Sequence, residues 1–206
     1  GQSYPFVAEK LNLLLGHVLY EGVDNVIDRP IYLPAIDVAS GTVINPAVDS
    51  EVHADLDQDG TPDADAMLTV AANTLVDREG NPFAGTLSIT QVPNELTPAA
   101  LPANLFPDLV VTIQPAEMVF NTPAPLTLPN RAGYSPGTVM DLWSINPVSG
   151  QFDKVGTGTV SADGSKVETI TGGIRNSSWH FFAPPPPNPL NPATNNKNED
   201  DGCDRC

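Results

Sequence analysis

The chain has 206 residues, with 25 acidic side chains against 9 Lys and Arg, which gives a formal net charge of -16 at pH 7. Nucleic acids and anionic membrane surfaces are bound through clusters of Lys and Arg, so this balance argues against both and favours divalent cations. The longest apolar stretch, LNLLLGHVLY, is far shorter than the ~20 residues that span a bilayer, so we expect no membrane insertion.

Residues 1–45 are expected to form an N-terminal extension or the end of a preceding module. Residues 4–23 (YPFVAEKLNLLLGHVLYEGV) fit either a short amphipathic helix or the last strand of such a module, and both alternatives stay open. Residues 29–38 (RPIYLPAIDV) fit a strand flanked by prolines.

Residues 46–183 consist of short segments with the alternation typical of β-strands, separated by turn residues. Turns are predicted at residues 79–82, 146–151 and 161–166, each of which contains a Gly that can adopt a positive φ. Thr97 is expected to cap a helical turn that begins at Pro98. We therefore predict an all-β fold, an antiparallel β-sandwich with little helix. The predicted strands are AMLTVAA (66–72), TLSITQV (86–92), DLVVTIQP (108–115), EMVFN (117–121), APLTLPN (124–130), TVMDLWSI (138–145), FDKVGTGTV (152–160), KVETIT (166–171) and WHFFAP (179–184).

Residues 184–206 (PPPPNPLNPATNNKNEDDGCDRC) are too polar and too rich in Pro to build a core. We expect a proline-rich spacer, which predicts that the chain is one module of a longer protein. Cys203 and Cys206 close this segment, and they are expected to form a disulfide in the tail or to belong to the framework of the next module.

The motif with the clearest chemistry is DLDQDGTPDADA, residues 55–66. Carboxylates at alternate positions can converge on one Ca²⁺ ion, a Gly at the sixth position lets the chain turn, and the seventh residue offers its carbonyl. The loop resembles the calcium loops of thrombospondin type-3 repeats and dockerins. The predicted calcium ligands are Asp55, Asp57, Asp59, Thr61, Asp63 and Asp65.

The twelfth position of this loop departs from the calcium pattern. A bidentate acidic side chain is expected there, but the residue is Ala66, and the spare carboxylate of Asp65 comes one residue early. We expect a weak site, with a Kd of roughly 10⁻⁴–10⁻³ M, whose role is to fold the loop before the next strand. The alternative is a solvated acidic turn without an ion.

A second resemblance covers residues 68–130, which are similar to the ZU-five domain, a β-sandwich of ankyrins, netrin receptors and zonula occludens proteins. It implies a non-catalytic scaffold or interaction module. Residues 141–183 resemble the segment that follows such domains in large bacterial surface proteins, some of which continue into YD-repeat shells of the RHS type. The residues that match the ZU-five pattern are Leu68, Val70, Ala72, Leu75, Pro115, Met118, Phe120, Pro123, Pro125, Leu126, Leu128 and Pro129.

Some relatives of this domain cut themselves at a His-Phe-Ser motif, and the corresponding run here is His180-Phe181-Phe182. Phe182 has no hydroxyl to attack the preceding carbonyl, so self-cleavage is disfavoured and we expect no enzyme. Trp143 and Trp179 suggest a carbohydrate-binding face, although core packing is favoured for both. Lys154 is the candidate for an intramolecular Lys–Asn isopeptide bond.

Together these features predict a calcium-stabilised structural or interaction module of a larger secreted or cell-surface protein. Its expected partners are other modules of the same protein or protein ligands. The alternatives are a carbohydrate-binding or adhesion module and, less favoured, a self-cleaving domain.

Overall fold

The computed structural model describes residues 20–24, 37, 39–97, 101, 105–146 and 149–185. The helix or strand predicted for residues 4–23, the strand predicted for residues 29–38 and the spacer beyond residue 185 lie largely or wholly outside these residues. Within the described part of the chain, no helix is long and apolar enough to cross a bilayer.

Strands dominate the described residues, so the all-β prediction is confirmed, and every pairing between strands is antiparallel. Each of the strands predicted between residues 66 and 184 overlaps a real one, although β7 and β11 extend beyond the predicted ends at residues 121 and 171. Four further strands, β1, β2, β4 and β12, escaped prediction because segments of two to four residues are too short to show alternation. The strands are β1 (Thr42–Val43), β2 (Ser50–His53), β3 (Met67–Val70), β4 (Leu75–Val76), β5 (Thr86–Val92), β6 (Val110–Gln114), β7 (Val119–Ala124), β8 (Leu126–Pro129), β9 (Val139–Ile145), β10 (Phe152–Val160), β11 (Lys166–Gly172), β12 (Ile174–Asn176) and β13 (Trp179–Ala183).

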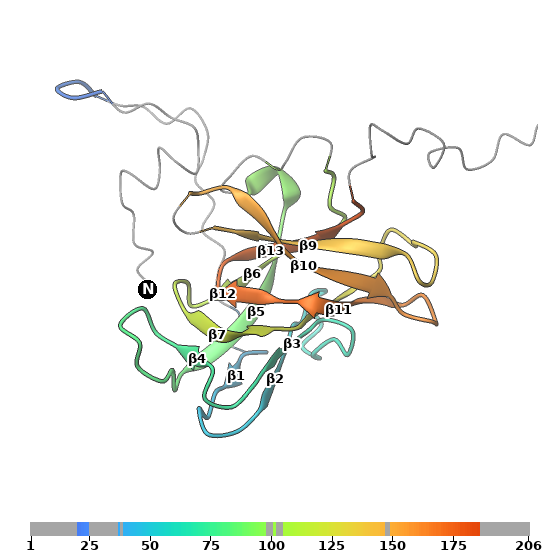
Figure 1. Cartoon of the computed structure of the whole chain (residues 1–206), viewed down its shortest axis with the longest axis horizontal. Coiled ribbons are helices and arrows are strands. Elements are labelled where there is room, and N and C mark those ends of the chain that lie inside the picture. The colour runs from blue at the N-terminus through green and yellow to red at the C-terminus, as the bar shows by residue number, and fades with distance from the viewer. Residues whose placement is uncertain are drawn as a thin grey trace, which may run out of the picture.

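Two sheets make up the domain (Figure 1). The ten-stranded sheet has the order β1-β5-β6-β13-β9-β10-β11-β8-β3-β2, and the three-stranded sheet has the order β12-β7-β4. The hydroxyl of Thr42 in β1 donates a hydrogen bond to the carbonyl of Glu51 in β2 (3.3 Å), so the two end strands of the large sheet lie side by side. The large sheet therefore curls back on itself, which gives the sandwich a barrel-like shape.

The turns at residues 146–151 and 161–166 connect β9 to β10 and β10 to β11, as predicted. Gly150 and Gly164 have φ values of 69° and 77°, which a residue with a Cβ adopts only at a cost. Thr97 follows a short 3₁₀ helix, η1 (Asn94–Leu96), and has an extended backbone, as expected for a residue before proline. The helix predicted to begin at Pro98 lies outside the described residues.

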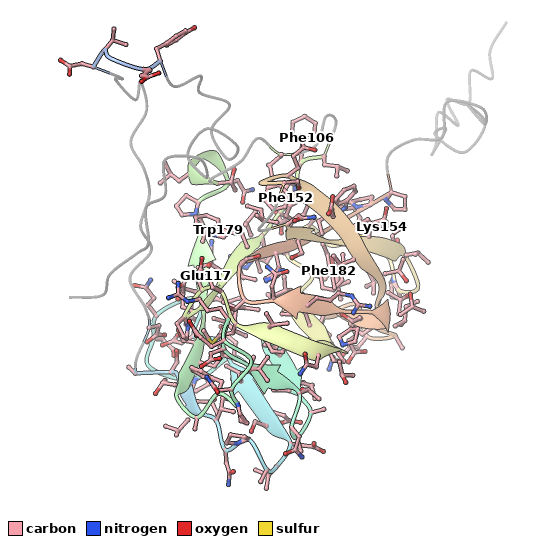
Figure 2. The ribbon with its side chains drawn as sticks, turned by 60° about the vertical axis from the view of Figure 1, so that its left-hand side comes forward. Phe106, Glu117, Phe152, Lys154, Trp179 and Phe182 are labelled. Carbon is pink, nitrogen blue, oxygen red and sulfur yellow. The ribbon has the colours of Figure 1, made fainter. Side chains whose placement is uncertain are left out.

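The large sheet is buried on both faces where β6, β13 and β9 run together. Consecutive residues of a strand point to opposite faces, and in β13 Phe182 joins the main core while Phe181 joins a second apolar cluster. Both side chains are buried, whereas Phe106 is 84% exposed at the rim of the domain (Figure 2). The second cluster consists of Val92, Leu105, Val110, Ile145, Phe152, Phe181 and Ala183, with Leu101, Trp143 and Trp179 packed against it.

Candidate metal centre

The acidic loop of residues 55–65 connects β2 to β3 and is closed at its base by backbone hydrogen bonds. The amide of Ala54 donates to the carbonyl of Ala66 (2.9 Å), and the amide of Asp63 donates to the carbonyl of Ala54 (2.6 Å). The side chains of Ala54 and Ala66 are fully buried. The loop therefore begins and ends on two fixed points of the core.

Leu56 fixes the loop from within, because its side chain is only 8% exposed and packs in the main core. Its backbone amide donates to Oδ2 of Asp63 (2.7 Å), which joins the second residue of the loop to the ninth. The apolar residue between the two aspartates therefore anchors the loop to the core.

The chain wraps around the carboxylate of Asp55. Oδ1 of Asp55 accepts a hydrogen bond from the amide of Asp59 (3.1 Å), and Oδ2 accepts one from the amide of Gly60 (2.9 Å). Gln58 and Gly60 have φ values of 60° and 88°, which reverse the chain over this carboxylate. The sixth position therefore has the turn for which a calcium loop requires Gly.

Three of the six predicted ligands place their carboxylates close together. Asp55, Asp57 and Asp63 each place a carboxylate oxygen so that all three oxygens lie within 4.8 Å of one another. Oxygens that share one Ca²⁺ at 2.3–2.6 Å are separated by at most about 5 Å, so this spacing fits a single ion. Without a cation the three carboxylates repel one another, and a bound Ca²⁺ would remove that repulsion.

Asp59, Thr61 and Asp65 lie outside this group of three. The carboxylate of Asp59 accepts a hydrogen bond from the amide of Thr61 (2.7 Å), which closes a small turn at the tip of the loop. The pKa of the Lys166 ammonium is raised, chiefly by its hydrogen bond to Glu168 and with weaker attractions from Asp163 and Asp65. The ion-pair partner of Lys166 is thus Glu168, at 2.9 Å, and Asp65 only adds a weak attraction.

The side chain of Ala66 accounts for the departure at the twelfth position. It is fully buried where the chain enters β3, so an acidic side chain at this position would point into the core and away from an ion. His53 supports the same end of the loop, because its Nδ1 lies 3.1 Å from the carbonyl oxygen of Asp63.

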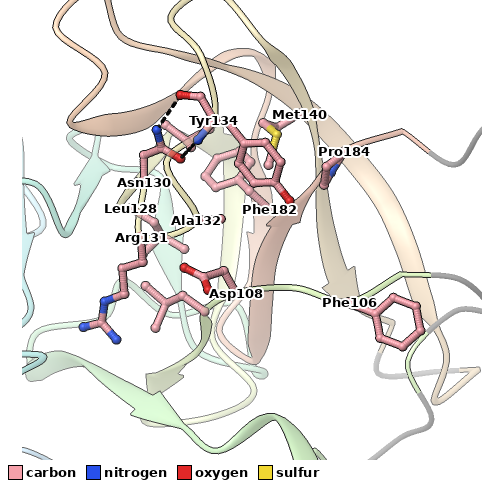
Figure 3. A pocket seen from close by; sticks show the side chains of 12 residues that line it. Phe106, Asp108, Leu128, Asn130, Arg131, Ala132, Tyr134, Met140, Phe182 and Pro184 are labelled. Carbon is pink, nitrogen blue, oxygen red and sulfur yellow. Dashed lines mark hydrogen bonds between the residues drawn. The ribbon is translucent and has the colours of Figure 1, made fainter. Parts of the chain in front are cut away.

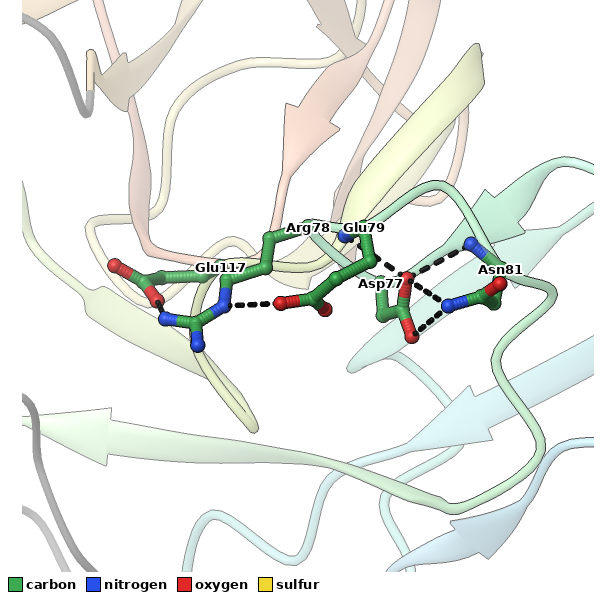
Figure 4. Close-up of polar contacts among 5 residues, drawn as sticks. All are labelled: Asp77, Arg78, Glu79, Asn81 and Glu117. Carbon is green, nitrogen blue, oxygen red and sulfur yellow. Dashed lines mark hydrogen bonds and ion pairs between the residues drawn. The ribbon is translucent and has the colours of Figure 1, made fainter.

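A second aspartate turn, at Asp77, serves as a comparison for the acidic loop. Oδ1 of Asp77 accepts hydrogen bonds from the amides of Glu79 (3.0 Å) and Asn81 (2.8 Å), while the guanidinium of Arg78 pairs with Glu79 (2.7 Å) and Glu117 (3.5 Å) (Figure 4). The hydrogen bonds that Asp77 accepts lower the pKa of its carboxyl, with those from Asn81 as the main cause. The carboxylate of Asp77 thus stabilises its turn by accepting backbone hydrogen bonds, and among the described residues it belongs to no group of three converging acidic side chains.

The two tryptophans considered for carbohydrate stacking, Trp143 and Trp179, are partly buried and pack against the second apolar cluster. The rings of Trp143 and Phe181 stack with centroids 6.3 Å apart and an interplanar angle of 16°. Carbohydrate binding stays a prediction that these two side chains do not support.

The run that corresponds to a self-cleaving motif is part of the core. His180 is fully buried, which lowers its pKa to about 3, and Phe182 is 6% exposed. The nearby hydroxyl of Ser177 donates to the carbonyl of Pro115 (2.6 Å) and accepts from the amide of Met118 (2.8 Å). This hydroxyl fixes the start of β7 and has a structural role.

Lys154, the candidate for an isopeptide bond, forms an ion pair instead. Its Nζ lies 2.6 Å from Oδ1 of Asp141, whose side chain is 5% exposed, while that of Lys154 is 48% exposed. The partner within reach is thus a carboxylate of the neighbouring strand β9 and not the asparagine that the predicted bond requires.

A shallow apolar hollow lies beside the strands β8, β9, β11 and β13 of the large sheet (Figure 3). Phe106 and Pro184 lie at its rim, and Met140, Tyr134 and Phe182 contribute to its wall.

No protein-family model matches the chain, and no curated protein has a significantly similar sequence.

Proposed function

We propose that this chain is a non-catalytic, calcium-stabilised structural or interaction module of a larger secreted or cell-surface protein. The observation that carries the proposal is the convergence of Asp55, Asp57 and Asp63 within 4.8 Å on a loop whose backbone is already wrapped around Asp55. Charge and turn geometry then both favour a hard cation with oxygen ligands.

The chemistry of the three carboxylates indicates a structural ion. Asp, backbone carbonyl and water ligands suit Ca²⁺ or Mg²⁺, whereas hydrolytic metals are usually held by His or Cys as well. Ca²⁺ suits this loop better because it tolerates irregular shells, while Mg²⁺ demands near-ideal octahedral geometry. The ion would hold together the connection between β2 and β3, at the end of the large sheet.

The affinity that such a loop can reach supports the proposed secreted or cell-surface location. A site with three convergent carboxylates and Ala66 at its twelfth position fits a Kd of roughly 10⁻⁴–10⁻³ M, which extracellular calcium can fill. An antibody against the domain should therefore label intact source cells or their medium, and labelling only after lysis would contradict this location.

The test of the ion is a calcium titration by calorimetry, combined with thermal unfolding in calcium and in chelator. Calcium at 100 times its Kd stabilises a folded protein by about 2.7 kcal/mol. We expect the melting temperature to rise by ~5–10 °C, since each kcal/mol shifts it by ~2–4 °C in a protein of this size. Mg²⁺ at the same concentration should give a smaller rise.

Matched variants separate ion binding from loop geometry. Asp57→Ala removes one of the three converging carboxylates and should abolish both the binding heat and the rise in melting temperature. Asp77→Ala removes a carboxylate that also accepts backbone hydrogen bonds in an exposed turn, so it should leave the calcium response unchanged. Absence of binding up to about 10⁻² M, beyond the weakest ordinary sites, would overturn the proposal and leave a solvated acidic turn.

A further inference from the structure

We draw no further inference here: the strongest candidate, the shallow apolar hollow beside the strands β8, β9, β11 and β13 between Phe106, Tyr134 and Pro184, carries nothing because the structure does not show what covers it.

Discussion

The amide of Leu56 and the carboxylate of Asp63 are joined across the acidic loop by a 2.7 Å hydrogen bond that needs no metal ion. Asp63 therefore has two roles, since it holds the loop closed and offers an oxygen to the group of three carboxylates. Asp57 is exposed, and its carboxylate accepts a hydrogen bond from the amide of Asp59 (3.2 Å) at the surface of the loop. The two aspartates can be separated by measuring stability without calcium.

In chelator, we expect Asp63→Ala to lower the free energy of unfolding by about 1.5–3 kcal/mol, because the half-buried amide of Leu56 loses a charged acceptor. Asp57→Ala should change it by less than about 0.5 kcal/mol, since it removes one of three like charges and only one bond of an exposed amide. Urea unfolding in EDTA measures both. Equal losses in the two variants would show that the loop does not depend on the Leu56–Asp63 bond.

A complete set of acidic ligands cannot be restored by changing Ala66. We expect Ala66→Glu to destabilise the domain by about 3 kcal/mol or more, because the new carboxylate would be placed in the core next to β3. Its calcium affinity should not exceed that of the parent. Asp65→Glu is the matched control, since residue 65 is half-buried and a longer acid there should be tolerated. Tighter calcium binding by Ala66→Glu would show that the loop can rearrange.

The sequence was sufficient for the features that depend on neighbouring residues. The segment TVMDLWSI (138–145) predicted the strand β9, and the spacing of Asp55 and Asp57 before Gly60 predicted the tight turn of the acidic loop, while ion binding stays a prediction. Both patterns arise within a few residues, so their physical causes are visible locally. The burial of both faces of β9 was not visible, because it depends on a second apolar cluster contributed by distant segments.

Two of the predicted calcium ligands, Asp59 and Asp65, lie outside the group of three carboxylates, and the spacing of the acidic residues in the sequence does not show this. Asp65 directly precedes Ala66, whose fully buried side chain fixes this end of the loop at the start of β3. The sequence spacing treats Asp65 as a spare ligand, whereas the position of its carboxylate depends on how Ala66 packs in the folded domain. The carboxylate of Asp59 accepts a hydrogen bond from the amide of Thr61, so its position depends on the turn at the tip of the loop.

The ion pair between Lys154 and Asp141 compensates a charge that is buried on one side only. The side chain of Asp141 is 5% exposed, whereas that of Lys154 is 48% exposed. We expect Lys154→Met to cost about 1–3 kcal/mol, because it leaves a buried carboxylate unpaired. Asp141→Asn combined with Lys154→Met should be less destabilising than Lys154→Met alone. Lys166→Met is the control, since its partner Glu168 is 45% exposed and should tolerate the loss. Similar costs for the two lysine variants would contradict the importance of burial.

His180 should make the stability of the domain depend on pH. Burial lowers its pKa to about 3, from a value near 6.5 in the unfolded chain. The unfolded state therefore binds a proton first as the pH falls, so the contribution of His180 is fully present above pH 6.5 and decreases continuously toward pH 3. Between pH 7.5 and pH 5 this amounts to about 2 kcal/mol of lost stability.

Urea unfolding at pH 7.5 and pH 5 checks this dependence, because most carboxylates stay ionised over that range. His180→Gln should reduce the loss to below about 0.5 kcal/mol, whereas the control His53→Gln, which changes a partly exposed histidine, should retain it. If His180→Gln does not fold, NMR of the parent provides a second test, since the imidazole of His180 should show no titration down to pH 4.5. A titration midpoint near pH 6, or an unchanged loss in His180→Gln, would contradict the burial of this side chain as a neutral group.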